Sequence, residues 1–259
     1  MEKAPYLKEE ETVVPHHKNP ADSLEKDYCD LIDLAVHDLD APLRKLTLLV
    51  GMLTGKLTKD KELQSYNERI VGCIEDMRSL IDDLSVLGKL ETTEKEITAC
   101  NIDSILQEAL QMLPPVVKEK HALVTSYSLP VIEGDRFQYR LLFKKLLENS
   151  ITFHKKDRAP EIHIESAILT AEEKRQLDLN DERLYYKIEV TDQGIGFKSE
   201  HADKIFQPFV RLHGKSQFPG NGIGLAICRK ITAIHRGIIY AEGGENEGAK
   251  FILILPESH

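Results

Sequence analysis

The chain has 259 residues, and its 34 lysines and arginines against 43 aspartates and glutamates give a formal net charge of −9. This balance argues against a general nucleic-acid-binding protein, because such a protein needs an excess of cations to neutralise phosphates. Hydrophobic residues make up 41% and charged residues 30%, as in ordinary globular proteins, and the length allows two domains. The four cysteines show no Cys-x-x-Cys pairing, so neither a zinc site nor a disulfide framework is expected.

The most apolar stretch, residues 46–53, is far shorter than the roughly 20 residues that a membrane-spanning helix needs. Residues 1–8 lack the apolar core of a secretion signal. We therefore expect a cytoplasmic protein with no membrane segment. Residues 1–21 are expected to be an N-terminal linker.

Residues 22–91 are expected to form a hairpin of two long helices, because apolar residues recur at alternating spacings of four and three. The first series is Ile32, Val36, Leu39, Leu43, Leu46, Val50, Leu53 and Leu57, and the second is Leu63, Tyr66, Ile70, Cys73, Met77, Leu80, Leu84 and Leu87. The polar link at residues 56–61 is short enough to allow only an antiparallel pair. Further apolar residues, such as Leu49, Ile74 and Ile81, widen each stripe, so we expect a homodimer in which two hairpins form a four-helix bundle.

His37 and Pro42 are the informative residues of the first helix. His37 follows Val36 by one position, which turns its imidazole away from the apolar series and toward solvent. Pro42 removes a backbone hydrogen bond inside the helix and predicts a kink just after the histidine. A reactive histidine would suit this place, but a surface histidine on a coiled coil is the simpler explanation from this helix alone.

From Ile97 onward, short β-rich segments alternate with helices, which predicts an α/β domain over residues 97–259. Residues 91–96 are charged and contain threonine, as expected of a linker. Helices are expected at residues 102–113, 135–153 and 225–235, and strands near residues 122–127, 161–168, 184–192, 237–241 and 250–255. The charged residues 171–181 are expected to be a hairpin insertion without a catalytic role.

A first glycine cluster follows Asp192 at the end of a predicted strand. The Asp192 carboxylate can accept a hydrogen bond from an exocyclic amine, and Gly194 and Gly196 would let the backbone approach a ligand. Taken alone, an aspartate with two glycines is more often a simple turn.

A second glycine cluster, Gly220, Gly222 and Gly224, opens a predicted helix at Leu225. Backbone N–H groups and the helix dipole at such a start can hold phosphate oxygens. The cluster lies too late in the domain for the dinucleotide fingerprint, and it lacks the lysine of a Walker motif.

Two further features lie near these clusters in the expected pocket. Asn149 stands among apolar residues on a predicted helix, where its carbonyl oxygen could ligate Mg²⁺ between phosphates or, equally, be a buried amide bonded to the backbone. Residues 205–209 are followed by Arg211 and Lys215, which indicates a flap that closes over phosphates.

In this order, the segments resemble sensor histidine kinases, in which a dimerisation and phosphoacceptor hairpin precedes a catalytic ATP-binding domain of the Bergerat type. The resemblance covers roughly residues 22–256 and implies a four-helix bundle followed by an α/β sandwich. Residues 37–43 look like the H box, residues 148–150 the N box, residues 192–196 the G1 box, residues 205–209 the F box and residues 220–224 the G2 box.

The resemblance implies an ATP-dependent protein-histidine kinase that uses Mg²⁺. His37 would be the phosphoacceptor, Asp38 its orienting base, Asn149 the Mg²⁺ ligand and Asp192 the adenine anchor. The phosphoryl group would pass from His37 to an aspartate on the receiver domain of a response regulator. An upstream sensor domain or partner is also implied, since only about 20 residues precede the hairpin and a sensor domain is larger than that.

Several residues depart from the family pattern. Lys145 stands where an additional asparagine often begins the N box, and Thr152 where a lysine or arginine often touches phosphate. Phosphate contacts are therefore expected from Lys145, Lys155 or Lys156, with Arg211 or Lys215 of the flap as further cations. Ala41 replaces a threonine or asparagine that positions water in many members, so we expect weak or absent phosphatase activity.

Two other functions remain open from the sequence. One is a catalytically weak dimeric scaffold that regulates a partner through its helical bundle, which the departures at Lys145 and Thr152 allow. The other is a conformational ATPase related to gyrase B or mismatch-repair proteins, with Glu148 as the base for water. The hairpin argues against the second, because such ATPases begin with their nucleotide domain.

Overall fold

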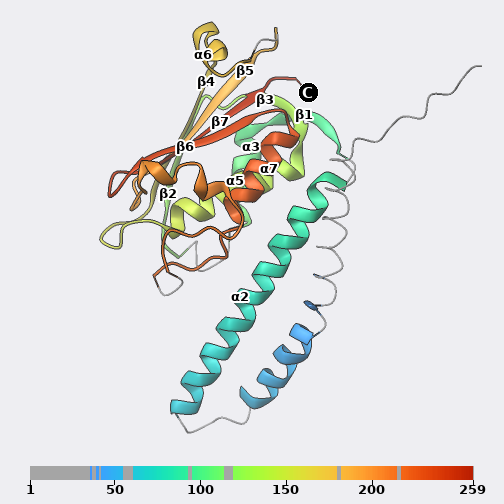
Figure 1. Ribbon diagram of the computed structural model, residues 1–259, viewed down its shortest axis with the longest axis vertical. Helices are drawn as coiled ribbons and strands as arrows, with labels where there is room; N and C mark the ends of the chain where they lie inside the picture. Colours follow the sequence, from blue (N-terminus) through green and yellow to red (C-terminus); the bar gives the residue numbers. More distant parts are fainter. Residues whose placement is uncertain are drawn as a thin grey trace, which may run out of the picture.

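The computed structural model describes residues 36, 39–40, 42–54, 61–92, 95–113, 119–179, 182–214 and 217–258. Figure 1 shows two parts, a pair of helices and a layered body of strands and helices. The long helix of the pair, α2 (Lys61–Thr92), runs along one side of the layered body. No helix in the described ranges is long and apolar enough to cross a membrane.

The predicted pair of long helices is confirmed. Residues 42–54 are helical and lie beside α2 (Figure 1). Leu43 and Val50 are buried against Ile74 and Ile81 of α2. Near the link between the helices, the Asn67 amide donates a hydrogen bond to the Thr54 hydroxyl at 2.9 Å.

The apolar series predicted along α2 is not the face that meets the first helix of the same chain. The expected series at Leu63, Tyr66, Ile70 and Met77 is 42–50% exposed, and the first helix is contacted instead through Val71, Ile74 and Ile81. On the first helix, Leu43 and Val50 are buried, whereas Leu39, Leu46 and Leu53 are 46–54% exposed. The physical reason is that one neighbouring helix covers only one edge of an apolar stripe this wide.

The layered body contains a five-stranded sheet in the order β2-β4-β5-β7-β6. Its strands are β2 (Leu123–Tyr127), β4 (Glu161–Ile168), β5 (Tyr185–Asp192), β6 (Ile238–Gly244) and β7 (Gly248–Pro256). Strands β2 and β4 are parallel, and the other neighbours are antiparallel. All five strands were predicted within a few residues.

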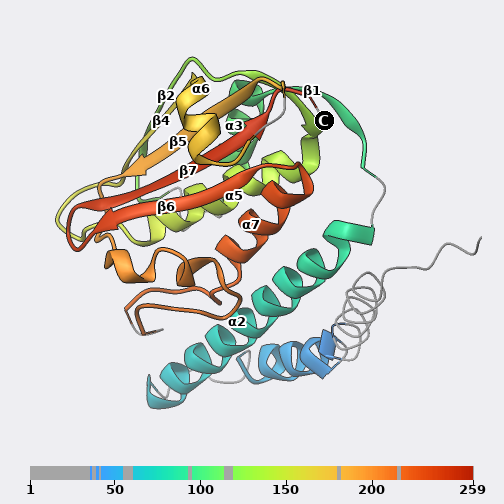
Figure 2. The same cartoon turned by 45° about the horizontal axis from the view of Figure 1, so that its top comes forward.

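Three helices cover one face of this sheet: α3 (Ile102–Gln111), α5 (Arg136–Thr152) and α7 (Gly224–Ile234) (Figure 2). Because side chains alternate along a strand, Phe251, Leu253 and Leu255 of β7 face the helices in the main core. Ile252 and Ile254 lie on the opposite face in a separate small core. The body is thus a helical layer packed on a sheet, as the α/β prediction required.

Some elements were not predicted. A second, two-stranded antiparallel sheet pairs β1 (Ile97–Asn101) with β3 (Val131–Asp135). Two short 3₁₀ turns, η1 (Ser199–His201) and η2 (Lys204–Phe206), precede the expected flap. The expected hairpin insertion instead contains a short helix, α6 (Ala171–Gln176), between two strands that pair directly with each other. A capping box between Thr170 and Glu173 starts this helix.

Candidate functional site

Helix α5 carries the polar residues of the expected N box. Its start is fixed by Asp135, whose side chain accepts a hydrogen bond from the Gln138 N–H at 3.0 Å. Lys145, Asn149 and Thr152 are spaced by four and three residues, so they share one side of the helix. All three are half-buried. Helix α5 packs against α7, which places these residues beside the second glycine cluster.

Asp192 ends β5 and is buried. Its Oδ1 atom accepts hydrogen bonds from the Gly194 N–H at 2.9 Å and the Ala249 N–H at 3.2 Å. Burial raises the pKa of the carboxyl above its ordinary value, against the lowering effect of these bonds and of the Ser150 hydroxyl. The Ser150 hydroxyl itself is buried without a well-formed hydrogen bond. An aspartate and a hydroxyl with spare hydrogen-bonding capacity fit the edge of a nucleobase.

The glycines after Asp192 are required by protein packing. A Cβ atom on Gly194 would lie 2.6 Å from the carbonyl oxygen of Phe153, at the end of α5. Gly196 has a φ of +63°, and a Cβ atom there would lie 2.0 Å from the carbonyl oxygen of Gly244. The loop is therefore wedged between α5 and the β6–β7 turn. The close approach of this backbone to a ligand stays a prediction from the sequence.

The second glycine cluster leads into α7 as expected. No side chain caps the start of this helix, so its first N–H groups have no side-chain acceptor there. Gly220 has a φ of +134° and open space where a Cβ atom would lie. Gly222 has a φ of +73° and is enclosed by Val210 and Arg211. Together with the half-buried Leu225, this uncapped helix start can receive an anion.

The flap folds over the end of α5. Phe153 and Phe218 have ring centroids 5.0 Å apart, and His213 lies 5.5 Å from Phe218. Arg211 donates a hydrogen bond to the carbonyl oxygen of Phe218 at 2.7 Å. Arg211, expected to contact phosphate, therefore braces the flap in this arrangement.

Lys145 is engaged by the hairpin. Its ammonium lies 2.5 Å from Oδ1 of Asp83 on α2 and 3.8 Å from Oε2 of Glu148. Burial acts to lower the pKa of Lys145, but the charge and hydrogen bond of Asp83, followed by the charge of Glu148, raise it above its ordinary value. The Lys145 side chain also passes the start of α7, with its Cδ 3.6 Å from where a Cβ of Gly224 would lie. The lysine thus stands between the second glycine cluster and an acidic residue of the hairpin.

The expected ATP-binding residues surround the C-terminal half of α5, with the first glycine cluster at Phe153 and the second at Lys145. His37, Asp38 and Ala41 lie outside the described residues, and so does Lys215. The sequence interpretation gave no role to Asp83, to Ser150 within the N box, or to the aromatic flap residues His213 and Phe218. Ser150 adjoins Asn149 in the sequence, and that proximity was the signal available for it.

Oxygen donors for Mg²⁺ are present on α5. Among the described residues, none forms a hydrogen bond with the side-chain amide of Asn149. Glu148 adds a half-buried carboxylate one residue earlier. Amide and carboxylate oxygens are ligands that Mg²⁺ accepts, usually together with phosphate oxygens and water. This donor set fits a nucleotide-bound Mg²⁺.

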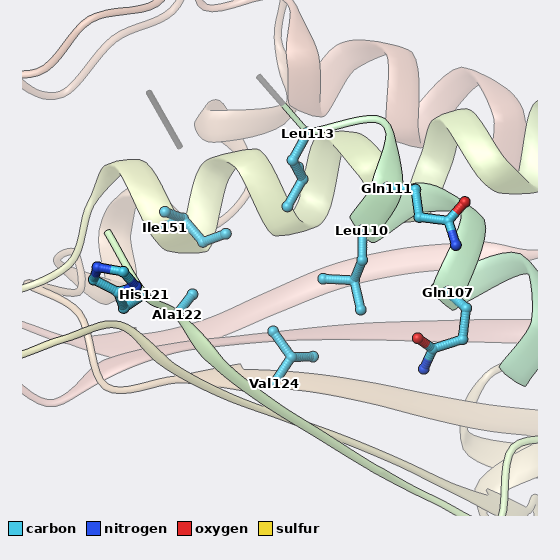
Figure 3. Close-up of a pocket in the computed structure, with 8 residues that line it drawn as sticks. All are labelled: Gln107, Leu110, Gln111, Leu113, His121, Ala122, Val124 and Ile151. Atoms are coloured by element: carbon cyan, nitrogen blue, oxygen red, sulfur yellow. The ribbon is translucent and has the colours of Figure 1, made fainter. Parts of the chain in front are cut away.

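A separate hollow of about 340 Å³ opens between α3, β2 and the end of α5 (Figure 3). Its walls are mainly aliphatic, with Gln107, Gln111 and His121 as the polar members. It contains none of the residues expected to bind nucleotide. This hollow is therefore distinct from the expected nucleotide site.

Comparison with known proteins identifies the relatives of this chain. Residues 134–259 match the family of histidine kinase-, DNA gyrase B- and HSP90-like ATPases. Cyanobacterial phytochrome A of Nostoc sp. is 34% identical over 226 residues, which are 86% of this chain and 28% of that protein. Phytochrome-like protein Cph1 of Synechocystis sp. is 30% identical over 241 residues, 91% of this chain and 30% of that protein. The chain thus spans less than a third of the length of these two relatives.

A solved structure shares the fold. Full-length ShkA in complex with AMPPNP aligns with a TM-score of 0.64 at 20% identity, over 88% of this chain and 45% of that chain. A helical region followed by an α/β domain is therefore the architecture that this chain has in common with that structure.

Proposed function

We propose that this chain, which is related over most of its length to sensor histidine kinases and carries their catalytic ATP-binding domain, is a protein-histidine kinase that autophosphorylates on His37. The observation that carries the proposal is the assembly of Asp192, Asn149 and the uncapped start of α7 around one helix. The role of His37 rests on the sequence.

The nucleotide would be held at two points. Asp192 would accept a hydrogen bond from the amino group of adenine, because the bonds from Gly194 and Ala249 both end on Oδ1 and leave Oδ2 available for the base. The phosphates would lie at the start of α7, near Gly220, Gly222 and Gly224, where the helix dipole favours negative charge. Mg²⁺, when bound with the nucleotide, neutralises phosphate charge, and Asn149 would be its protein ligand.

The transfer joins the γ-phosphorus to a ring nitrogen of His37 while the bond to the bridging oxygen of the departing ADP breaks. A neutral imidazole is a good nucleophile at cellular pH. Asp38 would hold the proton on the opposite ring nitrogen and pass it to solvent as the new bond forms. The phosphoryl group would then move to an aspartate on the receiver domain of a response regulator.

We also propose that the protein acts as a homodimer. The exposed apolar residues of the hairpin, including Leu46, Leu53, Ile70 and Met77, form the surface that a second copy would cover in a four-helix bundle. An upstream sensor domain or partner would deliver the signal through the same bundle.

Incubation with γ-labelled ATP and Mg²⁺ tests the kinase function. We expect label that survives base and is lost in acid, as a phosphohistidine is, and we expect His37→Gln to abolish it. His163→Gln is the matched control, because His163 is exposed on β4, on the face opposite to the core residues Ile162 and Ile164. Label of unchanged amount in His37→Gln would contradict the acceptor assignment.

One observation favours a second candidate, the dimeric scaffold. Lys145 is paired with Asp83 in this arrangement, so it is not free to contact phosphate. Measurable nucleotide binding without any histidine label, in a dimer that still binds a partner, would support the scaffold over the kinase.

A further inference from the structure

The C-terminal half of α2 lies against α7 of the ATP-binding domain (Figure 2). Leu90 is buried in the main core of that domain, and Leu84 and Leu87 pack against it. Two polar contacts continue the same face toward the second glycine cluster. The Asn221 amide donates a hydrogen bond to the Ser79 hydroxyl at 3.1 Å, and Asp83 pairs with Lys145.

The ion pair between Asp83 and Lys145 is almost closed to solvent. The two side chains are only 13% and 14% exposed, although they are 62 positions apart in the sequence. In such surroundings an unpaired charge is costly, so Lys145 needs an anion close by. Glu148 lies 3.8 Å away and is the weaker partner.

The ion pair between Asp83 and Lys145 lies beside the start of α7. The Lys145 side chain runs past Gly224, the first residue of α7, where no side chain caps the helix. Ser79 lies one helical turn before Asp83 and touches Asn221, which is between the glycines of the same cluster. An acidic residue of α2 is therefore held at the mouth of the site proposed for the phosphates.

We propose, building on the nucleotide site above, that Asp83 and the phosphates of the nucleotide compete for Lys145, so that α2 docking and nucleotide binding oppose each other. In the docked state Asp83 supplies the anion for Lys145. Phosphate would take over that role, and the polar part of the α2 face, Ser79 and Asp83, would be released. By linkage, nucleotide binding must weaken the docking of Ser79 and Asp83 by the same factor by which this docking weakens nucleotide binding.

Direct measurement of AMPPNP binding with Mg²⁺, by calorimetry on the whole chain, tests this competition. Asp83→Asn keeps the shape of the side chain but removes its charge, and we expect the Kd to fall about fivefold to 100-fold. Asp82→Asn is the matched control, because it makes the same change on the adjacent, exposed residue. In a Lys145→Met background, Asp83→Asn should no longer tighten binding, since the shared cation is gone.

A second measurement needs no variant. Hydrogen exchange of the wild-type amides at residues 79–83 should become faster when AMPPNP and Mg²⁺ saturate the protein, as the polar part of the docked face is released. Exchange that is unchanged or slower there would overturn the competition.

The outcomes separate this competition from the kinase function. Equal Kd values for Asp83→Asn and Asp82→Asn, with His37 still labelled, overturn the competition and leave the kinase. Tighter binding in Asp83→Asn without label on His37 supports the competition and contradicts the kinase. Absence of AMPPNP binding in all variants overturns both.

Discussion

In the hairpin, Leu48 and Met52 are each 66% exposed, whereas Leu142 and Phe143 of the ATP-binding domain have no exposed surface. The ATP-binding domain closes its core within one chain, between a sheet and three helices. The hairpin buries a short row of residues around Leu43 and Ile81 and leaves much of its apolar surface open. The difference teaches that a single chain, with Leu90 of α2 included, is enough to close the core of the domain, while the hairpin needs a further surface to cover it.

The largest effect is expected from a cavity in the closed core. Phe143→Ala should lower the free energy of unfolding of the ATP-binding domain by about 3–5 kcal/mol, because it removes a fully buried ring from α5. Phe137→Ala on the same helix is the control. Its ring is 56% exposed and has Arg140 5.6 Å from its centroid, so a loss of about 1 kcal/mol or less is expected. Urea denaturation measures both, and equal losses would contradict a self-contained core.

A smaller effect is expected on the hairpin, and it should depend on protein concentration. Leu46→Gln combined with Leu53→Gln should weaken the proposed homodimer by about 1.5–3 kcal/mol for each leucine that the dimer buries. Leu48→Gln is the control, because Leu48 is even more exposed, at 66%, but lies outside the heptad series. Sedimentation equilibrium measures the change. A wild-type protein that is monomeric at micromolar concentration would remove the bundle.

The elements that were predicted are those whose signal is local. Asp135 at its start and the apolar run around Leu142 predict helix α5. Continuous apolar residues predict strand β7. Strand β1 was missed because Ile97–Asn101 has little apolar alternation and is defined by its pairing with β3, thirty residues later. Thr170 followed by Glu173 is the sequence pattern of a capping box and indicates a helix start, but the expectation of a hairpin insertion did not take it into account.

The candidate site likewise contains residues that the sequence could predict and residues that it could not. Asn149, Asp192 and the glycine clusters were recognisable because their spacing and order follow a known family. The partner of Lys145 was not, because nothing in a heptad pattern distinguishes Asp83 from Asp82. Likewise, the pattern gives the width of an apolar stripe but not which edge a neighbour covers, and this is why Ile74 and Ile81 rather than Ile70 and Met77 meet the first helix.

The smallest effect is expected at helix α6. It tests whether local stability differs between the hairpin and the ATP-binding domain as such, or between exposed and buried elements of either part. Helix α6 belongs to the ATP-binding domain but has no buried residue. The hydrogen bond from Lys187, followed by those from Thr170, holds the pKa of Glu173 at about 2, below its ordinary 4.5. Since folding lowers this pKa, the resulting stabilisation is complete above about pH 4.5 and is lost as the pH falls toward 2.

The Glu173 side chain is 33% exposed, so solvent screens its ion pair with Lys187, and this stabilisation should amount to no more than about 1 kcal/mol. Glu173→Gln should therefore be slightly less stable than wild type above pH 4.5, and the two should converge as the pH falls toward 2. Glu172→Gln, the adjacent exposed glutamate, should follow wild type more closely. Unfolding by urea at several pH values measures the difference. If α6 unfolds in acid while the core stays folded, the exposure of an element determines its local stability, whichever part of the molecule contains it. The exposed hairpin would then be less stable than the core for the same reason. If Glu173→Gln and wild type differ by the same amount at every pH, the Lys187 contact does not depend on the charge of Glu173.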